Sequence, residues 1–160
     1  MTGNKHDIHV LNDLITATLD SADRLEHVAT ESANTGHVSL FTALAAERRD
    51  MARALQETVV ALGGQTDDRG SILSKAQRAV MDVRHALLGE EADLVGAADR
   101  GEAALDRKFE AALADQALSA TTRETLRRAH AAIHREKTEV RDLHNSLDSQ
   151  RDATSGVYPQ

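Results

Sequence analysis

The chain has 160 residues, a formal net charge of −7 and no cysteine. Its length fits one domain with its own core, and the lack of cysteine excludes disulfides, thiolate metal sites and cysteine nucleophiles. Interspersed charges and 2% aromatic content argue against nucleic acid as the main partner. There is no apolar run of membrane-spanning length and no signal-peptide pattern at the start. We therefore expect a cytoplasmic protein with no membrane partner.

Apolar residues recur with helical spacing along almost the whole chain, which contains a single proline. This pattern predicts long helices over residues 7–32, 37–62, 90–116 and 121–149. It also predicts a shorter helix over 71–88, between the second and third long helices. Gly63 and Gly64 follow the second helix, as glycine often does at a helix C-terminus, and one of the threonines 121 and 122 is expected to cap the last helix.

Two short turns make two antiparallel hairpins, and the connection between the hairpins is long enough to run back along a bundle. That connectivity is typical of ferritin-like bundles, which have one crossover. We therefore predict an all-α, ferritin-like four-helix bundle with an extra shorter helix in the crossover. Residues 1–149 would form its single domain, and residues 150–160 a disordered tail.

Several short segments carry a resemblance to a known family: VLNDLI (10–15), LDSAD (19–23), ALQETVVALGG (54–64), GSI followed by an arginine and a methionine (70–81) and DRGEAAL (99–105). Over about residues 8–147 the chain resembles the bacterial ferritin-like family called domain of unknown function 2383. The resemblance implies a ferritin-like fold, self-association into a homo-oligomer and a place among stress-related proteins, but it implies no reaction. The chain departs from the family pattern at Lys137, where the last helix usually has histidine.

Polar residues gather near the middle of each predicted long helix. Folding the hairpins about residues 34 and 118 places Asp20 level with Glu47 and Asp50, and places Glu102 level with His134 and Glu136. Ferritin-like bundles hold metal ions mid-bundle with carboxylates and Glu-x-x-His pairs, and such donors suit iron or manganese. The candidate metal ligands are Glu47, Asp50, Glu102, His130, His134, Glu136 and Glu139.

The same residues also fit a structural interpretation. Glu47 precedes two arginines, and Glu136 lies between Arg135 and Lys137, so the carboxylates have sequence neighbours that could pair with them in a buried layer. Neither expected helix contains Glu-x-x-His, and Lys137 could replace a metal cation. We therefore favour a structural or interaction module without catalysis, linked to stress adaptation. The alternative is an iron- or manganese-binding oxidative-stress protein with a degenerate carboxylate-rich site in the bundle core.

Overall fold

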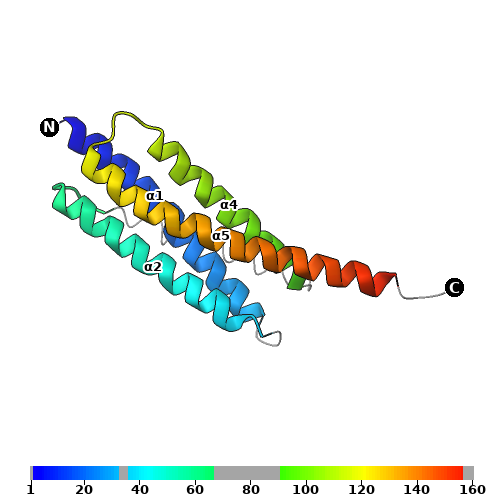
Figure 1. The fold of residues 1–160 in the computed structure, drawn as a ribbon. Helices are drawn as coiled ribbons and strands as arrows, with labels where there is room; N and C mark the ends of the chain where they lie inside the picture. Colours follow the sequence, from blue (N-terminus) through cyan, green and yellow to red (C-terminus); the bar gives the residue numbers. More distant parts are fainter. Residues whose placement is uncertain (1, 33–35, 67–90, 157–160) are drawn as a thin grey trace.

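The computed structural model describes residues 2–32, 36–66 and 91–156, and these form four helices (Figure 1). They are α1 (Thr2–Glu31), α2 (Val38–Ala61), α4 (Glu91–Leu113) and α5 (Ala120–Ser155). The predicted all-α bundle is confirmed, while its ferritin-like assignment stays a prediction. The predicted shorter helix, 71–88, lies outside the described residues. Within the described ranges, no helix is long and apolar enough to cross a membrane.

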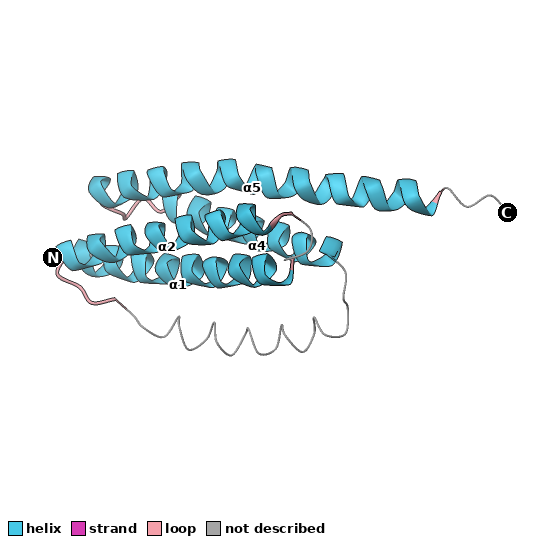
Figure 2. Cartoon of the chain, turned by 90° about the horizontal axis from the view of Figure 1, so that it is seen from below, coloured by secondary structure: helices cyan, strands magenta, loops and turns pink. Residues whose placement is uncertain are grey.

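The helices pack as two hairpins placed side by side. α1 lies along α2 and α4 lies along α5, while α1 also packs on α4 and α2 approaches α5. The end of α2 lies beside the start of α1, because Gly64 lies against Ile8. The start of α4 lies at the opposite end, where Leu94 joins the same apolar cluster as Phe41. α2 and α4 therefore begin at the same end of the bundle, and α5 extends past the other three helices (Figures 1 and 2).

The observed helix ends follow from local capping. At the end of α2, Gly63 has a φ of 84°, and the amide of Gly64 donates to the carbonyl of Val59, as predicted for a glycine stop. The cap of α5 was predicted two or three residues too late. Ser119 fills it, because its side chain accepts a hydrogen bond from the amide of Thr122. α5 also runs to Ser155 instead of ending near residue 149.

Among the residues that the structure describes, the core consists of two apolar clusters, one in each half of the bundle. One half contains Leu11, Ile15, Leu55 and Phe109. The other half contains a second group, whose buried members include Val28, Phe41, Val95 and Val140. Buried polar residues occupy the positions between these clusters on every helix. The site described below is therefore at the middle of the bundle, with apolar packing on both sides.

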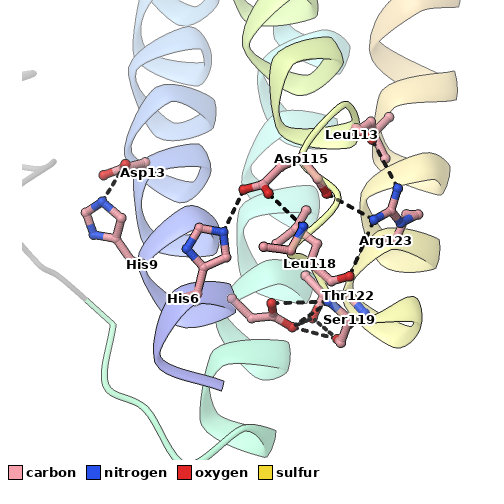
Figure 3. Close-up of polar contacts among 11 residues, drawn as sticks. His6, His9, Asp13, Leu113, Asp115, Leu118, Ser119, Thr122 and Arg123 are labelled. Atoms are coloured by element: carbon pink, nitrogen blue, oxygen red, sulfur yellow. Dashed lines mark hydrogen bonds and ion pairs between the residues drawn. The ribbon is translucent and has the colours of Figure 1, made fainter. Parts of the chain in front are cut away.

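A buried carboxylate ties the first helix to the turn between α4 and α5. Asp7 accepts hydrogen bonds from the Ser119 hydroxyl at 2.6 Å and from the Thr122 hydroxyl at 2.7 Å. Burial alone would raise the pKa of Asp7, but these hydrogen bonds outweigh it and lower the pKa. Figure 3 shows the same turn, where His6 lies 2.6 Å from Asp115. The turn is thus held to α1 by charge-assisted hydrogen bonds.

We expect the substitution Asp7→Ala to lower the free energy of unfolding by about 1–3 kcal/mol, because it leaves the buried hydroxyl of Thr122 and the hydroxyl of Ser119 without their acceptor. Urea unfolding followed by circular dichroism measures the change. Asp13→Ala is the matched control, since Asp13 lies on the same helix with a side chain that is 72% exposed. Equal stability of the two variants would show that the Asp7 contacts contribute nothing.

Candidate functional site

One polar side chain from each helix meets at the middle of the bundle. α1 supplies Ser21, α2 supplies Arg48, α4 supplies Glu102 and α5 supplies Glu136, and all four residues are buried. We call these four residues the central layer. Arg48, Glu102 and Glu136 each lie on the inward stripe of their helix, in line with the apolar core residues one turn before and after them. The sequence therefore places charge where the helical period calls for an apolar side chain.

Arg48 links the other charged members of the central layer. Its Nε and Nη2 atoms donate to Oε2 of Glu102 at 3.2 Å and 2.5 Å, and its Nη1 donates to Oε2 of Glu136. The Ser21 hydroxyl donates to the other oxygen of Glu102. The Arg48 side chain is 0% exposed and that of Glu102 is 1% exposed. Burial would lower the pKa of Arg48, but the two carboxyl groups outweigh it and raise the pKa.

Glu136 holds its proton up to near-neutral pH. Burial is the main cause, and a hydrogen bond with Glu47 adds to it, so that the pKa of Glu136 rises to about 7 despite the opposing charge of Arg48. The charges explain this result. One guanidinium balances one carboxylate, so ionising both Glu102 and Glu136 would leave an excess negative charge in a buried layer.

The structure brings only two of the predicted ligands into the central layer, Glu102 and Glu136. Asp50 and Glu139 are exposed, and Asp50 pairs with Arg53 at 3.0 Å. Glu47, another candidate ligand, is also exposed. The cause is simple: the buried stripe of α2 passes through Leu44, Arg48 and Ala52, and Glu47 lies about 100° away from Arg48 around the helix.

The donors of the central layer do not fit a ferritin-like metal pair. That site needs a carboxylate from each of two helices and Glu-x-x-His from each of the other two. Here α1 supplies a hydroxyl and α2 supplies a cation, and Glu139, three residues after Glu136, is exposed. Both oxygens of Glu102 already accept hydrogen bonds. Arg48, and not the predicted Lys137, occupies the position between the two carboxyl groups.

The two predicted histidines belong to a second polar group, on the side of the bundle where α4 faces α5. Asp106, Glu110, His130 and His134 each place one ligand-type atom within 4.8 Å of all the others. We call these four residues the peripheral cluster. Asp106 is buried, while the other three are partly or fully open to solvent. Lys137 Nζ donates to Asp106 Oδ2 at 2.7 Å, so Lys137 belongs to the surroundings of this cluster.

Asp106 is the centre of the peripheral cluster. Its Oδ1 lies 3.0 Å from His130 Nε2 and 3.2 Å from His134 Nδ1. Burial alone would raise the pKa of Asp106, but the hydrogen bonds from Lys137 and His134 outweigh it and lower the pKa. Asp106 is therefore a carboxylate at neutral pH, with nitrogen atoms of two imidazoles close to one of its oxygens.

Sequence reasoning missed Asp106 and Glu110 as site residues, and it offered Arg48 as a partner of Glu47 instead of Glu102 and Glu136. Arg48 lies on the apolar stripe of α2, and a search for apolar periodicity alone passes over a charged residue there. Asp106 and Glu110 are spaced four apart, as His130 and His134 are. Folding the predicted hairpin about residue 118 places residue 106 opposite residue 130, so this pairing could have been found from spacing alone.

These observations define an all-α helical bundle with a charged layer at its centre and a histidine–carboxylate cluster at its side. The chain belongs to the family described as domain of unknown function (DUF2383), whose model matches residues 6–115. The predicted family is thus confirmed. A comparison with curated proteins gives no match.

The raised pKa of Glu136 predicts a pH-dependent stability. An unfolded glutamate loses its proton near pH 4.5, whereas folded Glu136 holds it to about pH 7. Between these values the folded protein binds one more proton, so the contribution of Glu136 to the free energy of unfolding falls as pH rises, and levels off above pH 7.

Glu136→Gln should remove this contribution, because glutamine resembles the protonated carboxyl group and does not titrate. We expect the stability difference between the variant and the wild type to change steadily between pH 5 and pH 7 in favour of the variant, as measured by urea unfolding at each pH. Glu139→Gln, an exposed position on the same helix, should show no such change. A flat difference for Glu136→Gln would contradict the pKa assignment.

Proposed function

We propose that this protein is a cytoplasmic structural or interaction module, linked to stress adaptation, whose bundle centre sets the register of the helices and carries out no catalysis. The observation that supports this proposal is the position of Arg48. A guanidinium with 0% exposure lies between the two carboxyl groups that a metal ion at the bundle centre would need as ligands.

The chemistry of the guanidinium favours a structural role. Arginine stays charged at any physiological pH and donates hydrogen bonds in a rigid fork, so it cannot release a proton to a substrate. Arg48 uses three of its nitrogen atoms on Glu102 and Glu136. The guanidinium is thus engaged by partners within the layer, and the layer has apolar packing on both sides.

The second candidate is the iron- or manganese-binding oxidative-stress protein with a degenerate site in the bundle core. What favours it is that Glu102 and Glu136 share one height and one cation. A metal ion there would have to displace Arg48 from its carboxylate partners and leave a buried guanidinium unpaired, at a cost of several kcal/mol. The structural role therefore accounts for the same residues with fewer requirements.

The substitution Glu102→Ala is expected to lower the free energy of unfolding by about 3–5 kcal/mol, because removing one partner of a buried ion pair leaves the other uncompensated. Urea unfolding measures this loss, and Glu139→Ala on the exposed face provides the control.

Metal analysis of the tag-free protein decides between the two functions. The structural proposal expects no iron or manganese that depends on Glu102. Stoichiometric iron or manganese in the wild type that disappears in the conservative Glu102→Gln variant would overturn it in favour of the core metal site.

Replacing the whole charged group tests the structural role from the opposite direction. We expect the triple variant Arg48→Met, Glu102→Leu, Glu136→Leu to fold and to unfold at the same or a higher urea concentration than the wild type, because well-packed apolar residues often replace a buried ion pair without loss. A large loss of stability in this variant would show that the ion pairs stabilise the folded protein by more than the cost of burying their own charges.

A further inference from the structure

We propose that the peripheral cluster of Asp106, Glu110, His130 and His134 is a binding site for a divalent transition metal ion, of which zinc fits the donors best. The site is separate from the central layer and does not depend on the function proposed for that layer. It would join α4 to α5 at the side of the bundle.

The spacing of the four residues is that of a site shared between two helices. Asp106 and Glu110 lie four apart on α4, and His130 and His134 lie four apart on α5, so each pair occupies one face of its helix. Two histidines at this spacing on one helix are also how helical zinc sites present their imidazoles. Because α4 and α5 are antiparallel neighbours, the two faces oppose each other.

The distances between the ligand atoms are close to those around a tetrahedral ion. With metal–ligand bonds of about 2.0–2.1 Å, neighbouring ligands on tetrahedral zinc lie about 3.3 Å apart. Oδ1 of Asp106 lies 3.0 Å from His130 Nε2 and 3.2 Å from His134 Nδ1. Glu110 Oε1 lies 3.9 Å from His130 Nε2, and its side chain is 54% exposed. Glu110 can therefore close the remaining distance by a side-chain rotation.

His130 supplies a further observation that points to a ligand. Its Nε2 atom is buried and, among the residues that the structure describes, has no hydrogen-bond partner of acceptable geometry, although Asp106 Oδ1 is near. Buried polar atoms are normally satisfied. An ion held between His130 and Asp106 would satisfy this nitrogen through its lone pair.

Lys137 completes the arrangement from outside the site. Its ammonium group holds Oδ2 of Asp106 at 2.7 Å and leaves Oδ1 directed at the two imidazoles. Carboxylates that bind metals are commonly held in this way by an outer hydrogen-bond partner, which fixes their orientation. The side chain of Lys137 is 16% exposed and that of Asp106 is 3% exposed, so this support is sheltered from water.

The donor set selects the class of metal. Imidazole nitrogen suits zinc, copper, nickel and iron, whereas magnesium and calcium prefer oxygen ligands alone. Two imidazoles with two carboxylates therefore favour a transition metal over magnesium. The side chain of His134 is 58% exposed, which gives an ion a direct path from solvent.

Isothermal titration of the tag-free full-length protein with zinc chloride tests the proposal. We expect one zinc ion per chain and a higher melting temperature in its presence, because an ion that binds only the folded state stabilises it. Magnesium should give neither effect. The absence of zinc binding, or binding of magnesium with equal affinity, would overturn the proposal.

The variant His134→Ala should weaken zinc binding more than about tenfold, since losing even an outer partner of a ligand costs that much, and should abolish the rise in melting temperature. Its exposed side chain allows the variant to fold, which circular dichroism checks. His9→Ala is the matched control, because His9 forms an exposed pair with an aspartate four residues on. Unchanged zinc binding in His134→Ala would place the ion elsewhere and refute the site.

Glu136→Gln separates this proposal from any metal in the central layer. It should bind zinc as the wild type does, because Glu136 is not among the four ligands. Loss of zinc binding in Glu136→Gln would assign the ion to the bundle centre. That result would refute the peripheral site and, if iron or manganese behaved in the same way, the structural role of the central layer as well.

Discussion

The bridge from Arg48 to Glu102 and Glu136 is the interaction on which the rest of the bundle depends. A buried charge without a partner costs several kcal/mol, so α2, α4 and α5 must meet at the heights where these three residues are level. Sliding one helix by a single turn, about 5.4 Å, would break the bridge while leaving much of the apolar packing possible. Apolar side chains exclude water in both halves, and the charged layer penalises every register but one.

The same bridge explains why the two polar groups of this bundle have different chemistry. In the central layer the positive charge comes from the protein, is permanent and is held in a rigid fork. In the peripheral cluster the nitrogen atoms belong to imidazoles, which carry lone pairs when neutral, and three of the four residues reach solvent. A ligand can enter the second group without unfolding the bundle, whereas the first is enclosed between Phe41 on one side and Phe109 on the other.

Much of this organisation could be predicted from sequence, because helical periodicity and turn residues determine helix number and height. The hairpin folding correctly placed Glu102 level with Glu136. The inward face of α2 could not be predicted in the same way. Apolar counting skipped Arg48, and its neighbour Glu47 was taken as the ligand, on a helix whose inward face beside Arg48 includes the small residues Ala45 and Ala52. Each residue is rotated by about 100° from the one before it around a helix, so a small error in the orientation of α2 changes which of its side chains faces the two carboxylates. Small alanine side chains indicate that orientation only weakly.

Both polar groups combine residues inside the range that the family model matches with residues of α5, which lies after that range. The matched residues, 6–115, contain Arg48, Glu102, Asp106 and Glu110. Their partners on α5 follow the matched range. The central layer thus takes three of its four residues from the matched range and one from α5, while the peripheral cluster takes two from each. The chemistry of both groups therefore depends on what α5 presents at residues 130–137. At one face of that helix a carboxyl group closes the central layer, and at the neighbouring face two imidazoles and an ammonium group surround Asp106. Because these faces belong to one rigid helix, the register imposed by Arg48 on Glu136 also sets the height of His130 and His134 against α4.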